Sequence, residues 1–247
     1  MRRVGLFLLG VLLLGACAGP PEPSPSPSPS PSPAPSTTTP PPGTTTEAAP
    51  DPRATPRLLD AVAAGDLAAV RAAIDAGADP GARDGDGRPV LVTATRANHV
   101  EIARALLAAG ADPNATDGIQ DSAFLYAGAE GRDEILRLTL DHGADVRATN
   151  RFGGTALIPA SEHGHVTTVR ILIAAGVPVN HVNDLGWTAL LEAIVLGEGG
   201  PDHVAVVDQL LAAGADPGIA DREGRLPRQL AADRGLDEIV ALIDRRR

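Results

Sequence analysis

Apolar residues recur at spacings of three and four through the last three quarters of the chain, which predicts short amphipathic helices. Val169, Leu172 and Ile173 follow this pattern, and such spacing places side chains on one helix face. Three stretches share the pattern and the same ending: ARALLAAGADPN (103–114), VRILIAAGVPVN (169–180) and VDQLLAAGADP (207–217). The glycine near each end can adopt a left-handed conformation and stop the helix. The pattern therefore predicts helices that end at regular intervals.

Glycines fix the length of the repeating unit. Three sets of positions recur at one constant step: Gly77, Gly110, Gly143 and Gly176; Gly65, Asn98, Gly131, Gly164 and Gly197; Gly87, Gln120, Gly153 and Gly186. Gly214 and Gly224 continue the first and third sets after a longer step. A fixed period of about 33 residues is the signature of a repeat protein. In this alignment Gly197 is the glycine between two helices, and about five residues near Glu198 to Asp202 form an insertion, which we expect to lengthen one loop.

The repeat resembles the ankyrin repeat, a β-turn followed by two antiparallel helices. Gly153-Gly154-Thr155-Ala156-Leu157 and Gly186-Trp187-Thr188-Ala189-Leu190 are similar to the family's G-x-T-P-L start. Thr155 and Thr188 are predicted to cap the first helix of their repeats. The family's His after this motif is replaced by Val92, Leu125, Ile158, Leu191 and Gln229. The resemblance implies an all-α solenoid of about six ankyrin repeats with short β-hairpin turns, over residues 57–247.

The N-terminal segment, residues 1–56, differs in composition from the rest. Arg2 and Arg3 precede an apolar run, Val4 to Leu14, that is too short to span a bilayer. Leu14-Gly15-Ala16-Cys17 resembles a bacterial lipoprotein signal, which implies a signal peptide over 1–16 and lipid attachment at Cys17. Residues 17–56 are rich in Pro, Ser and Thr, and we expect this stalk to be disordered. The chain as a whole resembles an exported bacterial ankyrin-repeat lipoprotein, held by its lipid on the extracytoplasmic side of a cell membrane.

Charge and composition exclude several function classes. All 21 basic residues are Arg, and the net charge is -10. Catalysis or phosphate binding through a lysine is therefore excluded, and nucleic acid is not an expected partner because its phosphates require a basic surface. Glu198 to Asp202 carries two acids and no base, so a phosphate loop is not expected there. We predict no cofactor and a monomeric protein.

The sequence motifs do not indicate a catalytic site. Cys17 is the only cysteine, and no nucleophile signature accompanies a His and an acid, so the chain is not expected to be an enzyme. His163, His165, His181 and His203 lie in adjacent repeats with Glu192, Glu198 and Asp202. A metal or small-molecule site formed by this cluster is the alternative to a binding module, although no ligand spacing motif supports it.

The resemblance places a partner-binding surface on the inner face of the first helices and on the hairpin tips. The predicted binding residues are Arg96, Tyr126, Glu130, Arg151, Phe152, Glu162, His163, Asp184, Leu185, Trp187 and Glu192. Tyr126 and Trp187 are the expected anchors, because aromatic side chains dominate interfaces. The alternatives are that Trp187 covers a neighbouring hairpin and that Glu192 is a solvated charge. The acids around repeats four and five predict a protein partner with a basic patch.

Overall fold

The computed structural model describes residues 51–246, and these residues form twelve helices arranged as six antiparallel pairs. The helices are α1 (Ala54–Ala64), α2 (Leu67–Asp75), α3 (Val90–Arg96), α4 (Val100–Ala108), α5 (Ala123–Ala129), α6 (Asp133–Asp141), α7 (Leu157–Glu162), α8 (Val166–Ala174), α9 (Ala189–Val195), α10 (Pro201–Ala212), α11 (Pro227–Asp233) and α12 (Asp237–Arg245). All the described residues belong to one unit, Ala48–Arg247. The predicted all-α repeat solenoid is confirmed.

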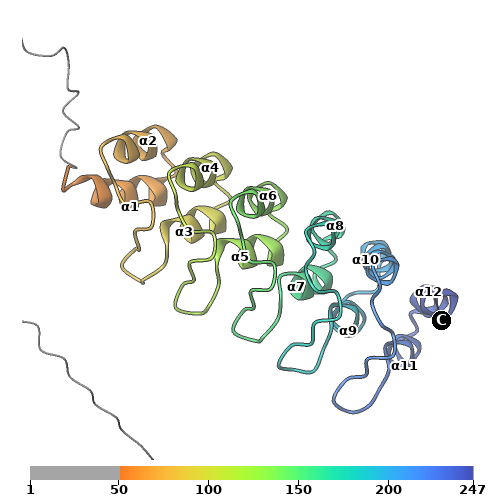
Figure 1. Cartoon of the computed structure of the whole chain (residues 1–247). Helices are drawn as coiled ribbons and strands as arrows, with labels where there is room; N and C mark the ends of the chain where they lie inside the picture. Colours follow the sequence, from red (N-terminus) through yellow and green to blue (C-terminus); the bar gives the residue numbers. More distant parts are fainter. Residues whose placement is uncertain (1–50, 247) are drawn as a thin grey trace, which may run out of the picture. The chain divides into compact units, whose positions relative to one another are not determined.

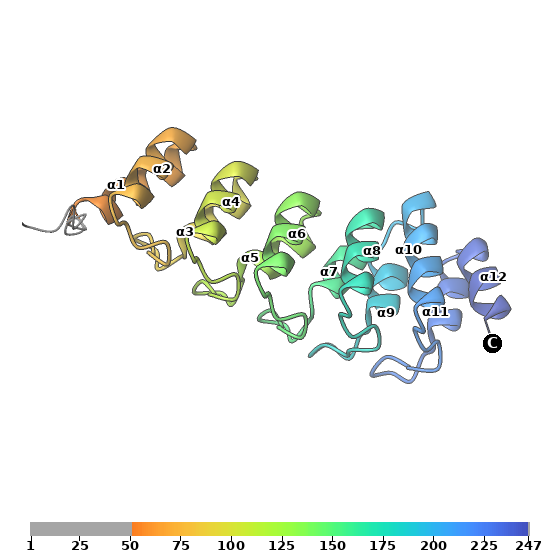
Figure 2. The same cartoon turned by 45° about the horizontal axis from the view of Figure 1, so that its top comes forward.

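The pairs stand side by side in a row, with the even-numbered helices along one side and the hairpin loops projecting on the other (Figures 1 and 2). The odd-numbered helices lie between them and form the inner layer, next to the hairpins. Each odd-numbered helix packs on its own even-numbered partner and on the odd-numbered helix of the next repeat. The first helices and the hairpins therefore share one face of the solenoid.

Large apolar side chains at one repeat position form part of the core between the helix layers. Its members occupy equivalent places in successive repeats and are at most 1% exposed: Leu58, Leu91, Phe124, Leu157 and Leu190. Burying a side chain of this size contributes about 1.5–3 kcal/mol to stability. These five side chains belong to one cluster of buried residues that extends through all the repeats. The core is therefore continuous along the row of helix pairs.

Hydrogen bonds between hairpins fix the stacking of successive repeats. Asn180 Nδ2 donates to the Gly214 carbonyl at 3.0 Å, and Asn180 Oδ1 accepts from the Asp216 amide at 2.8 Å. Asn114 makes the same pair of contacts to Gly143 and Asp145. One side chain thus satisfies two backbone groups of the neighbouring repeat.

The structure corrects the prediction that both Thr155 and Thr188 cap helices. Thr188 Oγ1 accepts from the Leu191 amide at 3.2 Å and caps α9. Thr155 Oγ1 is buried and has no hydrogen-bond partner within residues 51–246. Pro159 lacks the amide that would bond to the Thr155 carbonyl. That carbonyl accepts instead from Ile158 at 3.1 Å, which uses the amide that the hydroxyl would have capped.

The structure also corrects the interpretation of the insertion near Glu198 to Asp202. The left-handed glycine of this repeat is Gly199, with φ +72°, and Gly197 has no positive φ. Pro201 and Asp202 begin α10, which has 12 residues, whereas α8 has nine. The extra residues therefore lengthen a helix as well as the loop, because proline is well suited to the first helical position.

Helix α1 begins at Ala54, ahead of the predicted boundary at Arg57. The expected signal peptide, Cys17 and nearly all of the proline-rich stalk lie outside the described residues. Within residues 51–246, no helix combines the length and the apolar character needed to cross a membrane.

Candidate functional site

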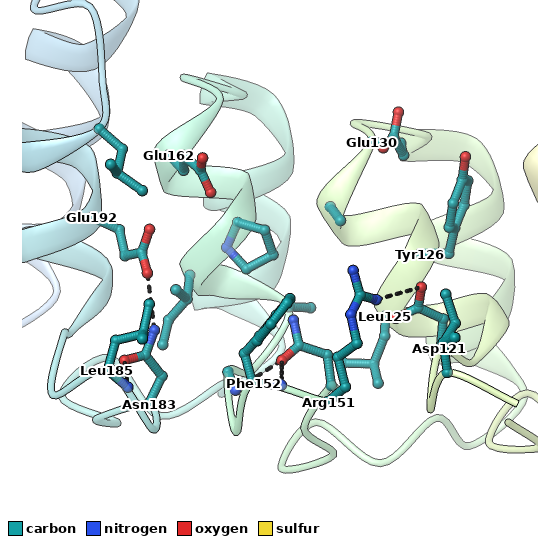
Figure 3. A pocket seen from close by; sticks show the side chains of 18 of the residues that line it. Asp121, Leu125, Tyr126, Glu130, Arg151, Phe152, Glu162, Asn183, Leu185 and Glu192 are labelled. Atoms are coloured by element: carbon teal, nitrogen blue, oxygen red, sulfur yellow. Dashed lines mark hydrogen bonds and ion pairs between the residues drawn. The ribbon is translucent and has the colours of Figure 1, made fainter. Parts of the chain in front are cut away.

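A groove of about 500 Å³ runs along the inner face from repeat two to repeat five. Its lining comes from the first helices α3, α5, α7 and α9, their C-terminal ends, and the hairpins that precede α5, α7 and α9. The lining residues are Arg96, Ile119, Asp121, Leu125, Tyr126, Ala129, Glu130, Asn150, Arg151, Phe152, Gly154, Ala156, Ile158, Pro159, Glu162, Asn183, Leu185, Glu192 and Leu196. Figure 3 shows these side chains converging on the groove from helices and loops.

Exposed apolar side chains gather in this groove. The part of the chain that the structure describes has five large apolar residues that remain strongly exposed, and four of them line the groove: Ile119, Phe152, Leu185 and Leu196. Ile119, Phe152 and Leu185 occupy the same hairpin position in successive repeats. The period of the repeat therefore places them in a row.

Asx turns determine the backbone conformation of the hairpin tips that carry Phe152 and Leu185. Asn150 Oδ1 accepts from the Phe152 amide at 2.9 Å and from the Gly154 amide at 3.0 Å. Asn183 Oδ1 accepts from the amides of Leu185 and Trp187 at 3.0 and 2.9 Å. An asparagine that bonds to the backbone two and four residues ahead stabilises the turn. These turns place the apolar side chain of each tip along the groove.

At the repeat-three end of the groove, arginines stack on aromatic rings. The Arg96 guanidinium lies 4.9 Å from the centre of the Tyr126 ring, and the Arg151 guanidinium lies 4.5 Å from that of Phe152. Arg151 also approaches Asp121 to 3.6 Å. Burial raises the pKa of Asp121, while the charge of Arg151 opposes that rise. Both arginines therefore already have partners, and these contacts hold the two rings in place.

At the repeat-five end, Glu192 is a buried acid. It lies on α9, is only 4% exposed, and accepts a hydrogen bond from Asn183 Nδ2 at 2.9 Å. Desolvation, reinforced by the charge of Glu162, raises the pKa of Glu192 to about 7. The Asn183 hydrogen bond and His163 oppose this shift. The alternative of a solvated surface charge at Glu192 does not hold.

The groove brings together eight of the eleven predicted binding residues: Arg96, Tyr126, Glu130, Arg151, Phe152, Glu162, Leu185 and Glu192. Three lie elsewhere. Trp187 does not line the groove and is half-buried, packed against the core. Asp184 lies at the hairpin tip, where its amide donates to the Phe152 carbonyl at 2.9 Å.

His163 lines a second hollow of about 420 Å³ beside the groove, together with Glu162, Leu196, Glu198, Gly200, Pro201, Asp202 and His203. Its Nδ1 lies 3.0 Å from the Ala129 carbonyl, and His203 Nε2 lies 2.8 Å from the Glu162 carbonyl. His181 Nε2 likewise bonds to Gly153 at 2.6 Å. These three imidazoles link neighbouring repeats. In the described range 51–246, no three His, Cys, Asp or Glu side chains are grouped so as to hold a metal ion.

The lining residues that the sequence did not predict include three that shape the groove: Ile119, Asn183 and Leu196. Ile119 stands one period before Phe152, so the register that found Phe152 and Leu185 contained its signal. Asn183 could also be found, because Asp84, Asp117, Asn150 and Asp221 occupy the same repeat position. Leu196 had no such signal, because its exposure depends on how the following loop leaves α9.

A row of helix pairs with a groove on its inner face, lined by apolar and charged side chains, is typical of helical-repeat proteins that bind other proteins. The chain belongs to the ankyrin repeat family: the family model described as ankyrin repeats in three copies matches residues 58–150 and 124–221. Ankyrin repeats bind protein partners, and homologues built from them are typically interaction domains without enzymatic activity.

Solved structures agree with this assignment. An ankyrin repeat domain from Acinetobacter baumannii AYE is 54% identical, with a TM-score of 0.75 over 76% of this chain and 96% of that one. The ankyrin repeat protein EF0377 is 39% identical, with a TM-score of 0.74 over 77% and 97% of the two chains. A 52-residue stretch is 46% identical to the ankyrin repeat protein YahD of Escherichia coli (strain K12) and spans 21% of this chain and about a quarter (26%) of that protein.

Proposed function

We propose that this chain is a lipid-anchored extracytoplasmic protein whose ankyrin repeats bind a protein partner through the inner-face groove. The observation that carries the proposal is the row of exposed apolar side chains, Ile119, Phe152, Leu185 and Leu196, along one groove. Exposed apolar patches with a polar rim are typical of interaction surfaces. The chain is expected to act as a monomer that recruits or restrains its partner.

The chemistry of the groove favours binding over catalysis. Its lining contains no Ser, Thr, Cys or His, so it offers none of the usual nucleophile and base pairs. Its aromatic and arginine side chains, Tyr126, Phe152, Arg96 and Arg151, are of the types that contribute most to protein interfaces.

The binding surface is tested by capturing partners from solubilised membranes with residues 48–247 as bait and then measuring their affinity for variants. Tyr126→Ala and Phe152→Ala should each weaken binding by about fivefold or more, because truncating an anchor costs about 1 kcal/mol or more. Arg104→Ala and Arg170→Ala change exposed residues on α4 and α8 and should have no effect. If these controls weaken binding while the groove variants do not, the groove is not the binding surface.

The membrane anchor rests on the pattern Leu14-Gly15-Ala16-Cys17 after a short apolar run. Two acyl chains on Cys17 would hold the protein stably, whereas one alone gives only marginal binding. Cell fractionation of the wild type and of Cys17→Ser tests this part of the proposal. The substitution should move the protein out of the membrane fraction, and a variant that stays with the membrane would exclude lipid attachment at Cys17.

A further inference from the structure

We propose that the repeat-five end of the groove is a recognition site for a lysine or arginine side chain carried by an extended segment of the partner, with Glu192 and Glu162 contacting its cation. This inference rests on the proposed protein-binding function and identifies the chemistry of the partner. It follows from three observations: Glu192 is buried with one carboxylate oxygen free of hydrogen bonds within residues 51–246, other acids lie near it, and a row of apolar side chains lies along the same groove.

The Glu192 carboxylate is only half satisfied. Asn183 Nδ2 donates to its Oε1, and Oε2 has no hydrogen-bond partner among residues 51–246. The side chain is 4% exposed, yet it lines the groove (Figure 3). A carboxylate that has lost most of its water gains strongly from a cation that takes the place of that water. The unused oxygen is therefore available for a donor that enters along the groove.

The groups around Glu192 leave a net negative charge. Glu162 and His163 at the end of α7 are the charged or titratable groups that act on it from that helix. From α10, His203 is bound to the Glu162 carbonyl. From α11, Arg234 donates to the Val195 and Gly197 carbonyls at 2.6 and 2.9 Å. That guanidinium caps the end of α9 and does not line the groove.

No arginine lines the groove at this end. Both lining arginines, Arg96 and Arg151, lie over aromatic rings toward repeat three. The second hollow, which shares Glu162 with the groove, adds the acids Glu198 and Asp202. Acids outnumber basic side chains at this end, where His163 and His203 of the second hollow are the basic groups and no arginine lines either surface. This complementarity favours a cationic occupant.

Apolar side chains form the approach to the acids. Leu185 and Leu196 line the groove together with Glu192. In Figure 3, Leu185 lies below Glu192 and beside Asn183, and Phe152 follows on the side of the preceding repeat. Lysine and arginine bury their methylene stems on apolar surface while the charged end reaches a polar group. The row continues to Ile119, so the occupant crosses several repeats. An extended segment with apolar residues beside the cation fits this shape.

The raised pKa of Glu192, about 7, gives the site a pH dependence with a definite sign. Binding a cation favours the ionised carboxylate, so below pH 7 the carboxyl must first lose its proton. Affinity for a cationic segment should therefore rise as the pH increases from 6 to 8. Glu192→Gln should remove this dependence as well as most of the affinity.

The experiment selects binders from a phage-displayed library of random dodecapeptides on residues 48–247. This unit has its own continuous core, and the related solved chains consist almost entirely of the region it shares with them, so it folds alone. A parallel selection uses the double variant Glu162→Gln, Glu192→Gln. Synthetic versions of the strongest peptides are then measured against the wild type, each single variant, and Phe152→Ala at pH 6 and pH 8.

Selection on the wild type should enrich Lys or Arg next to apolar residues, and selection on the double variant should lose this enrichment. Glu192→Gln should weaken binding of a selected peptide by about tenfold at pH 8, and replacing the basic residue of the peptide by norleucine should weaken it equally. Binders that lack basic residues but depend on Phe152 would overturn the cation site while supporting the groove. Binders unaffected by any groove substitution would overturn both.

Discussion

Asn183 Nδ2 donates to Glu192 Oε1 at 2.9 Å and thereby joins the hairpin of repeat five to the first helix of the same repeat. The Oδ1 of the same amide holds the hairpin through Leu185 and Trp187. Asp84, Asp117 and Asp221 make the equivalent turn contacts in other repeats with a carboxylate. An ionised carboxylate can only accept hydrogen bonds, whereas an amide can both accept from the turn and donate to a neighbouring acid. The acid in the groove therefore depends on the choice of asparagine at this position.

Asn183→Asp should destabilise the domain, because it places a second carboxylate against Glu192 and removes the donor. We expect a loss of about 2 kcal/mol at pH 8, measured by urea denaturation. Asn150→Asp is the matched control, since Asn150 makes the same turn contacts and the uncharged Pro159 occupies the repeat position of Glu192. Adding Glu192→Gln to Asn183→Asp should restore most of the loss. Equal effects of the two Asn→Asp substitutions would refute the role given to the amide.

Glu192→Gln should stabilise the domain at pH 8 and have little effect near pH 5. The pKa of Glu192 is raised to about 7 in the folded chain, so the folded state binds a proton more tightly than the unfolded state, and its stability falls as the pH rises from about 4.5 to 7. Glutamine retains the acceptor for Asn183 and carries no charge. We expect a gain of about 2 kcal/mol at pH 8, checked by thermal denaturation at both pH values. A gain of equal size at pH 5 would contradict this account.

Thr155→Val and Thr188→Val should differ although the two residues share a repeat position. Thr188 Oγ1 caps α9, so its loss should cost about 1 kcal/mol. Thr155 Oγ1 is buried without a partner in the described part of the chain, so valine there should be neutral or stabilising. Chemical denaturation of both variants makes the comparison. A greater loss for Thr155→Val than for Thr188→Val would show that the Thr155 hydroxyl has a role that its contacts do not reveal.

Gly128→Ala should destabilise the domain although alanine favours helices. A Cβ at Gly128 would lie 2.7 Å from the Ala156 Cβ of the next repeat, and the helices would have to separate. Overpacking of this kind costs about 1–3 kcal/mol, which outweighs a helix-propensity gain of about 1 kcal/mol. Ala156→Gly in the same chain should recover most of the stability. If stability is not recovered, the close approach of residues 128 and 156 is not the cause of the destabilisation.

The sequence by itself determined the repeat and eight of the residues that line the groove. The constant repeat period aligned the helices, the hairpins and the residues of the inner face, and eight of the predicted binding residues do line one groove. This succeeded because stacked repeats place equal positions on equal faces. The membrane anchor at Cys17 and the signal peptide remain predictions from sequence.

Only the tertiary structure decided which of these residues line the groove, how deeply each is buried and how its pKa is shifted. Trp187 packs on the core, Glu192 is buried beside Glu162, and Gly199 rather than Gly197 takes the left-handed conformation. Each outcome depends on contacts with a neighbouring repeat or on the path of one loop. A periodic pattern assigns a residue to a face, whereas its burial and its pKa follow from the particular side chains that surround it.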